Sequence, residues 1–228
     1  MYHNQCIICH EIITNPLTID NLFSELNVVC QSCMEKMLMI KECKRCPICK
    51  KKLEEGEDNC LDCMFIEKHF GFVNEVDYVC DYNEIVANLI HQYKSNGDIL
   101  LAQAFAQCIN TKFNRRYFRQ FDYIIPLPIS EERLKVRGFN HITEIMKYVK
   151  VPYHQIIETE FREKQMNLSK TERMLQENPF RLNYPIKDNS RILLVDDIYT
   201  TGLTISHAHS VFLPYKYYEI KVLAFARA

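Results

Sequence analysis

The sequence contains no tryptophan and only five glycines in 228 residues, and no apolar run in it approaches the ~20 residues that cross a bilayer. An excess of charge of either sign is also missing. There are 28 Lys and Arg residues against 29 Asp and Glu residues, which gives a formal net charge of −1. These absences exclude a membrane-spanning helix and a protein that is basic over its whole surface. Because no apolar signal segment follows Met1, we expect a soluble protein of the cytoplasm.

Cysteine, in contrast, is abundant, with 11 residues. Two residues between thiolates allow one turn to present both sulfurs to a tetrahedral Zn²⁺, a spacing that disulfide frameworks do not require. Eight of the cysteines are arranged in this way, as Cys6 and Cys9, Cys30 and Cys33, Cys46 and Cys49, and Cys60 and Cys63. Eight ligands predict two structural zinc sites, with an iron–sulfur cluster as the alternative cofactor. Each zinc is expected to supply roughly 10 kcal/mol or more of folding free energy to a segment too small and charged to form its own core.

The four cysteine pairs can be combined in two ways. Sequential pairing joins the first pair to the second and the third to the fourth, whereas a cross-brace joins the first to the third and the second to the fourth. We favour sequential pairing because consecutive elements are usually neighbours. Cys43 could replace a ligand, although the four pairs are complete without it. Cys80 and Cys108 fall on apolar faces and are expected to be small core residues.

A second feature lies between residues 191 and 204. Residues 192–195 form a continuous apolar run that is typical of a buried parallel strand, and from Gly202 the apolar pattern becomes helical. Hydroxyl groups, a glycine that permits close approach and the unpaired N–H groups of a new helix together form a site for a phosphate monoester. Two carboxylates at the strand end can accept hydrogen bonds from vicinal sugar hydroxyls and assist magnesium held by substrate phosphates. The residues concerned are Asp196, Asp197, Thr200, Thr201, Gly202 and Thr204.

This order of strand, Asp-Asp, two residues and Thr-Thr-Gly resembles the signature of the type I phosphoribosyltransferases. The resemblance implies that the loop binds the ribose 5-phosphate part of phosphoribosyl pyrophosphate (PRPP), with magnesium. Tyr199 departs from the family, which usually has a smaller apolar residue there, so the packing of the loop is open. Arg133, Lys135 and Arg137 follow a predicted strand at the place where these enzymes put their pyrophosphate loop. We favour Arg137 as a ligand contact because Gly138 lets the backbone approach closely.

The composition changes near Met64, which predicts two domains. Residues 1–66 are expected to form a zinc-binding domain with four-cysteine sites, and residues 75–228 a phosphoribosyltransferase-like, PRPP-binding domain. In the second domain, apolar patterns predict strands at 77–82, 123–127, 191–195 and 220–226, and helices at 85–93, 98–110, 139–149 and 201–212. Asp98 is expected to cap the second of these helices. The alternation predicts an α/β fold with a parallel sheet, and ligands beyond the carboxyl ends of its strands.

The resemblance extends over nearly the whole chain. The cysteine pairs are followed by Ile90-His91-Gln92-Tyr93-Lys94, Gly97-Asp98, Pro126-Leu127-Pro128, Arg137-Gly138-Phe139-Asn140, Gln165 with Leu168, and Arg173. This combination is similar to the ComF family, whose members are bacterial competence proteins needed to bring transforming single-stranded DNA into the cytoplasm. The resemblance implies a zinc- and PRPP-binding protein of DNA uptake, with single-stranded DNA and the competence helicase as candidate partners, the latter at the inner face of the membrane. It implies no settled reaction, so transfer of a phosphoribosyl group to an unknown acceptor is the alternative function.

Residues 112–119 interleave cations with aromatic rings. Cations on phosphates and rings under bases are the means by which single-stranded nucleic acid is held without sequence preference. The candidate contacts are Lys112, Phe113, Arg115, Arg116, Tyr117 and Arg119. The alternative is a charged surface exposed to solvent.

One cysteine motif and two histidines each allow a functional interpretation that the sequence does not favour. A RING-type module that recruits a protein is suggested by Cys46-Pro-Ile-Cys49, but there is no histidine between Cys30 and Cys63. His91 and His141 could donate protons, although a hydrogen-bonded structural role is the default for a histidine.

Overall fold

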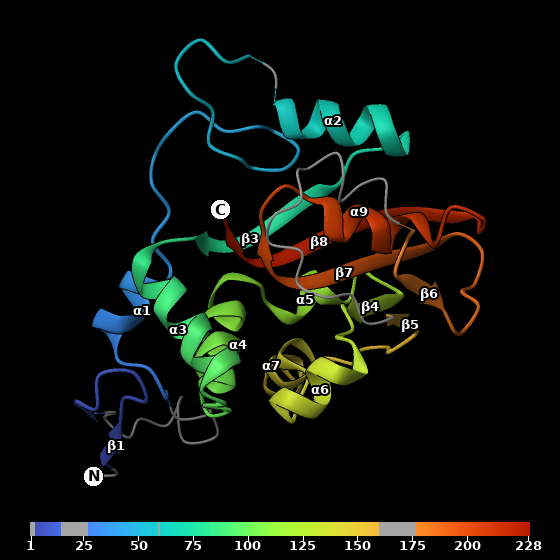
Figure 1. Cartoon of the computed structure of the whole chain (residues 1–228). Helices are drawn as coiled ribbons and strands as arrows, with labels where there is room; N and C mark the ends of the chain where they lie inside the picture. Colours follow the sequence, from blue (N-terminus) through green and yellow to red (C-terminus); the bar gives the residue numbers. More distant parts are fainter. Residues whose placement is uncertain (1–2, 15–26, 59, 160–176) are drawn as a thin grey trace.

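The computed structural model describes residues 3–14, 27–58, 60–159 and 177–228. At its centre lies a four-stranded sheet in the order β3-β8-β7-β4 (Figure 1). The strands are β3 (Glu75–Asp81), β4 (Tyr123–Pro126), β7 (Ser190–Tyr199) and β8 (Tyr217–Arg227). Neighbouring strands are parallel in all three pairings. The predicted α/β fold with a parallel sheet is therefore confirmed.

Helices cover both faces of this sheet. In Figure 1, α2 (Leu61–Phe70) and α9 (Leu203–Ser210) lie above it. The helices below it are α3 (Glu84–Ser95), α4 (Leu101–Lys112), α6 (Glu131–Arg137) and α7 (His141–Val149). Burial on both faces explains why the central part of β7, Ile192, Leu193 and Leu194, is apolar and fully buried.

Short elements complete the described part of the chain. They are β1 (His3–Gln5), β2 (Ile12–Thr14), α1 (Gln31–Met37), α5 (Arg115–Phe118), β5 (Ile157–Thr159) and β6 (Phe180–Leu182). The β1–β2 and β5–β6 pairs are antiparallel. Three residues are too few for a period-two pattern to stand out, so the sequence did not predict these strands. No helix among the described residues combines the length and apolarity needed to cross a membrane.

Two local expectations fail at helix starts. Asp98 does not cap α4, since the helix begins after Leu100 and has no side-chain cap, and Asp98 contributes only a main-chain oxygen to Leu101. A basic loop was expected around residue 135, yet the structure has helix α6 there. Ser130 caps α6 by accepting a hydrogen bond from the N–H of Arg133, and two glutamates occupy the first turn. A serine cap and an acidic first turn both favour the start of a helix, but the prediction of a loop considered only the basic residues here.

The two cysteine-rich units contact different parts of the α/β fold. In the first, the N–H groups of Val28 and Val29 donate to Gln107 of α4, at 2.9 and 3.2 Å. In the second, Ile48 accepts a hydrogen bond from the N–H of Val76 in β3, and α2 packs against α9. Figure 1 shows β1 and α1 near α3 and α4, and α2 on the opposite side of the sheet. Each unit is therefore held by its own contacts.

Candidate functional site

Two acids lie at the carboxyl end of β7, where its neighbour β4 has already ended. The last pair between these strands joins Pro126 to Val195, whereas pairing with β8 continues to Tyr199. Asp196 and Asp197 therefore follow directly after the last residue of β7 that pairs with β4. Asp196 accepts a 2.9 Å hydrogen bond from the N–H of Asp197, and burial raises the pKa of Asp196 to about 7.

Helices α3 and α7 bring basic groups to Asp197, and α6 adds Arg137 next to them. Lys94 of α3 forms an ion pair with its Oδ2, and Nε2 of His141 lies 3.5 Å from the same oxygen. Arg137 donates from Nη1 to Nδ1 of His141 at 2.8 Å, and from Nε to the main-chain oxygen of Lys94 at 3.1 Å. A guanidinium group can only donate, so Nδ1 of His141 is an acceptor and its proton sits on Nε2, which faces the carboxylate.

The histidine in this group is neutral. Burial, together with the charges of Lys94 and Arg137, lowers the pKa of His141 well below its ordinary value. The imidazole therefore lies between the Arg137 guanidinium group and the Asp197 carboxylate. Arg137, predicted as a direct ligand contact, is half-buried and also serves to orient this histidine. The sequence did not indicate that Lys94 and His141 would meet at Asp197, because the three helices join only in the folded chain.

The threonine loop follows at the same end of β7. Gly202 has φ of 82° and forms the N-cap of α9. Its carbonyl accepts hydrogen bonds from the N–H and the hydroxyl of Ser206, at 2.8 and 2.9 Å. Asn74 donates in turn to that hydroxyl at 2.8 Å. The predicted residues Thr200, Thr201 and Thr204 are exposed or half-buried at this helix start, so their hydroxyls and the first N–H groups of α9 are accessible to an anion.

The loop accommodates Tyr199, which is larger than the residue usual at this position. Its side chain is buried, and the guanidinium group of Arg227 lies 5.1 Å from the centre of its ring. A Cβ added at position 202 would lie against the Tyr199 hydroxyl and 2.7 Å from its Cζ. The ring therefore occupies the space that the missing side chain of Gly202 leaves.

Gly202→Ala is expected to disturb the loop for two reasons. The left-handed backbone costs about 1–2 kcal/mol for a residue with a Cβ, and the contact with Tyr199 adds to this. Gly97→Ala is the matched control, because Gly97 has φ of 72° but open space around its Cβ position. Urea unfolding should show a larger loss of stability for Gly202→Ala. Equal losses in the two variants would show that the Tyr199 contact contributes nothing.

The eight paired cysteines form two clusters. The sulfurs of Cys6, Cys9, Cys30 and Cys33 lie within 4.8 Å of one another, and so do those of Cys46, Cys49, Cys60 and Cys63. The sequential pairing is therefore the observed one. Bonds of ~2.3 Å to a tetrahedral zinc place sulfurs about 3.8 Å apart. Separations of 3.6 Å for Cys9–Cys30, 3.7 Å for Cys46–Cys63 and 3.5 Å for Cys49–Cys60 fit such a metal, and both clusters could hold one.

Both clusters are built on the same plan. The first pair of each lies in a turn. In this turn the main-chain N–H of His10 donates to the carbonyl of Cys6, and the main-chain N–H of Lys50 donates to the carbonyl of Cys46. His10 and Lys50 both have φ near 60°, at 62° and 60°. The second pair of each begins a helix, α1 or α2. A hydrogen bond involving Cys63, together with Arg227, lowers the pKa of Cys49 to about 4, and a lowered pKa favours the thiolate form that binds zinc.

The remaining cysteines are not part of either cluster. Cys43 is exposed, and its sulfur contacts the main-chain oxygen of Lys41. Cys80 and Cys108 are fully buried, as predicted for core residues. Cys108 lies 3.4 Å from the sulfur of Met34, so it forms part of the contact between the first cysteine-rich unit and α4.

In the basic segment, some side chains contact other parts of the protein and others face the solvent. Tyr117 donates to Asp77 at 2.8 Å and packs against Phe113, while Lys112 donates to the carbonyl of Val79 at 3.2 Å. The side chains of Arg115, Arg116 and Arg119 are exposed. Two of these arginines line a cavity of about 440 Å³ at the amino end of β4, together with Phe118, Phe121, Asp122, Ile124, Lys150, Val151, Pro152 and His154. This cavity lies at the other end of β4 from the two acids of β7.

Other residues singled out in the sequence have plain positions. His91 is exposed on α3. Gln165, Leu168 and Arg173 lie outside the described residues.

Comparisons with known proteins agree with this architecture. A family model described as "Phosphoribosyl transferase domain" matches residues 98–228. The chain is 26% identical over 206 residues to "Competence protein ComFC" of Streptococcus pneumoniae (strain ATCC BAA-255 / R6), which covers 89% of this chain and 90% of that protein. It is 28% identical over 208 residues to "Competence protein ComFC" of Bacillus subtilis (strain 168), with 89% and 86% covered. Together with the parallel sheet and the two four-cysteine clusters, these matches show that the chain belongs to the phosphoribosyltransferase domain family, as a member of the ComF type.

Proposed function

We propose that the chain binds PRPP with magnesium at the carboxyl end of β7 and acts on single-stranded DNA in competence. The ligand assignment rests on one observation: Asp196, Asp197 and the 200–204 loop all lie at the same end of β7. Ligands of open parallel sheets bind beyond the carboxyl ends of the strands. The competence role is carried by similarity to the two ComFC proteins.

Each part of the site has its own task in this proposal. The hydroxyls of Thr201 and Thr204 and the first N–H groups of α9 bind the 5-phosphate, and the carboxylates of Asp196 and Asp197 accept hydrogen bonds from the ribose hydroxyls. Magnesium neutralises the pyrophosphate and is assisted by these acids. Lys94 pairs with Asp197, and Arg137 donates to His141 and to the main-chain oxygen of Lys94, so both add positive charge for the pyrophosphate group.

Calorimetry of the protein with PRPP and magnesium chloride tests the ligand assignment. Saturable binding at one site per chain is expected, and no heat of binding would contradict the proposal. Released pyrophosphate should be measured in the same samples, with and without added bases. Release that depends on an added base would favour the alternative function, phosphoribosyl transfer.

For single-stranded DNA we propose the surface formed by Arg115, Arg116 and Arg119. All three side chains are exposed, and two line the cavity beside Phe118 and Phe121. Cations for phosphates next to an apolar hollow for a base are suited to a single strand. Because Tyr117 and Phe113 pack within the protein, the arginines carry this proposal.

Replacing the three arginines by alanine is expected to weaken binding of a single-stranded oligonucleotide and to flatten its salt dependence. Each lost phosphate contact removes roughly 0.7 from the slope of log affinity against log salt concentration, so the slope should fall by about 2. The matched control replaces the same residues by lysine, which keeps the charges and should keep the slope. PRPP binding should be unchanged in both variants. Wild-type affinity of the alanine variant across the salt series would rule out this surface.

A further inference from the structure

The second cysteine cluster and the threonine loop share one buried side chain, Arg227. This residue ends β8 and is 2% exposed. On one side it donates from Nε to the carbonyl of Cys49 at 2.6 Å and from Nη2 to the sulfur of Cys49 at 3.5 Å. On the other side it donates from Nη1 to the carbonyls of Tyr199 and Thr200, both at 2.9 Å. Nη1 also contacts the main-chain oxygen of Ala228.

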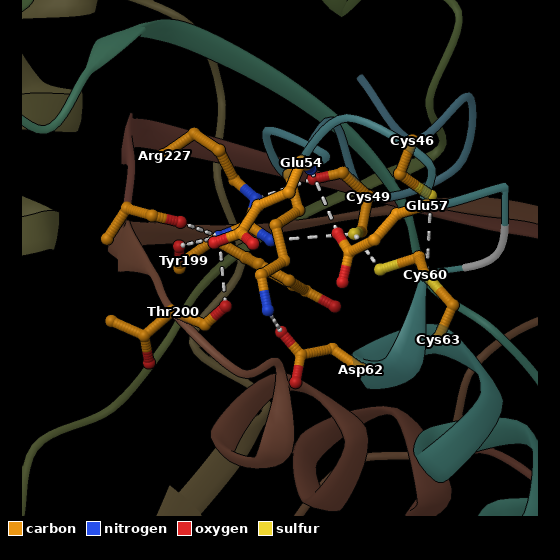
Figure 2. Close-up of polar contacts among 12 residues, drawn as sticks. Cys46, Cys49, Glu54, Glu57, Cys60, Asp62, Cys63, Tyr199, Thr200 and Arg227 are labelled. Carbon is orange, nitrogen blue, oxygen red and sulfur yellow. Dashed lines mark hydrogen bonds and ion pairs between the residues drawn. The ribbon is translucent and has the colours of Figure 1, made fainter. Parts of the chain in front are cut away.

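Figure 2 shows the geometry of this connection. Arg227 lies between Cys49 and the main chain of Tyr199 and Thr200, with Cys46, Cys60 and Cys63 grouped beyond Cys49. The ring of Tyr199 packs against the same guanidinium group and fills the space next to Gly202. One planar group therefore fixes the position of a cluster ligand and the two residues that precede Thr201.

We propose that Arg227 couples metal binding at the second cysteine cluster to the sugar-phosphate loop, so that the loop has its ligand-binding form only when this cluster holds its metal. The inference rests on the proposed ligand site at the 200–204 loop. Arg227 is a positioning residue in this scheme, since it donates to the loop carbonyls and leaves the hydroxyls of Thr201 and Thr204 for the ligand.

The physical basis is the cost of a buried cation. A buried guanidinium group needs anionic or carbonyl partners in fixed places, and it is destabilising when one partner moves away. A metal held by four thiolates fixes both the carbonyl and the charged sulfur of Cys49. Without metal the four sulfurs are no longer tied together, and the turn at residues 46–49 loses its constraint. Arg227 then loses two of its contacts and no longer holds the carbonyls of Tyr199 and Thr200 in place.

The first cluster provides an internal control, because its unit contacts helices α3 and α4, whereas the second cluster contacts β8 and the threonine loop through Arg227. Val28 and Val29 bond to Gln107 of α4, and Met34 contacts Cys108. Loss of metal there has no direct route to the threonine loop. The two clusters share ligand type and construction, so a difference between them reports the connection through Arg227.

Two single substitutions in the full chain separate the clusters. Cys60→Ser removes a ligand of the second cluster, and Cys9→Ser removes one of the first. The amides of Ser206 and Ala228 donate to the carbonyls of Gly202 and Tyr199, so their hydrogen exchange reports on the loop. This exchange should become at least about tenfold faster in Cys60→Ser, and PRPP with magnesium should bind about tenfold more weakly. Cys9→Ser should match the wild type in both measurements. Equal changes in the two variants, or none in Cys60→Ser, would overturn the inference.

A third variant tests the side chain itself. Arg227→Lys keeps a positive charge beside Cys49 but lacks the planar fork needed to reach both segments. It should retain two metal ions per chain and a wild-type circular dichroism spectrum, yet show faster exchange at the amides of Ser206 and Ala228. Wild-type exchange in this variant would mean that Arg227 does not hold the loop.

Two outcomes must be kept apart. If the wild type fails to bind PRPP, the proposed ligand is wrong, and the exchange difference between Cys60→Ser and Cys9→Ser still decides whether the coupling exists. If the wild type binds PRPP, coupling must be reciprocal, so saturating PRPP should raise the zinc affinity of the second cluster by the same factor in a chelator competition. The factor should fall to about one in Arg227→Lys.

Discussion

Asp196→Asn combined with Asp197→Asn is expected to abolish measurable PRPP binding. A hydrogen bond to a charged group contributes about 1.5–3 kcal/mol, and two carboxylates that serve the ribose hydroxyls and assist magnesium are neutralised together. A loss of at least about 3 kcal/mol corresponds to more than a hundredfold in affinity. Calorimetry with PRPP and magnesium measures it directly. An unchanged dissociation constant would remove the basis for the ligand assignment.

The variant should also lose some stability, which must be separated from the loss of binding. Asp197 is a partner of Lys94, whose side chain is partly buried, so neutralising the acid removes one ion pair of this lysine. Asp122→Asn is a suitable control, because Asp122 lies at the other end of the sheet and accepts a 2.8 Å hydrogen bond from the N–H of Arg191. This control should bind PRPP as the wild type does. Urea unfolding of both variants shows whether the Asp196→Asn, Asp197→Asn variant is still folded when it no longer binds PRPP.

Local features were predictable from the sequence because short-range chemistry determines them. The spacing of the cysteines indicated the ligand pairs, and the preference for neighbouring elements indicated the observed sequential clusters. An apolar strand followed by Asp196, Asp197 and a threonine-rich turn predicted the strand-to-helix junction of β7 and α9. In each case residues within one short segment determine the geometry.

Features that depend on tertiary contacts were not predictable in the same way. Lys94, His141 and Asp197 come from three separate elements, and the hydrogen bond that orients His141 needs Arg137 from a fourth. In the sequence Arg227 looks like any residue at the end of a strand, but in the structure it is buried between the second cysteine cluster and the threonine loop. The alternation of rings and cations at residues 112–119 could not tell which side chains face inward. Tyr117 faces Asp77 because β3 supplies a half-buried acceptor there.

The metal prediction has the largest expected effect on folding. Purified protein should contain two zinc ions per chain, and Cys6→Ser and Cys60→Ser should each remove about one. Structural zinc contributes roughly 10 kcal/mol or more, so chelation of both ions should unfold the cysteine-rich units. The sheet should persist, because Ile192, Leu193, Leu194 and their neighbours form an apolar core without any metal ligand.

Circular dichroism and elemental analysis test these expectations together. Helical signal from α1 and α2 should be lost on chelation, while the strand contribution is kept. Cys43→Ser is the matched control, since Cys43 is exposed and outside both clusters, and this variant should keep two zinc ions and wild-type stability. Iron in place of zinc, or one ion per chain whose loss follows only Cys6 or only Cys60, would contradict the prediction of two zinc sites. Full retention of helical signal after removal of both ions would show that the cysteine-rich units are stabilised by their contacts with α4 and β3 instead.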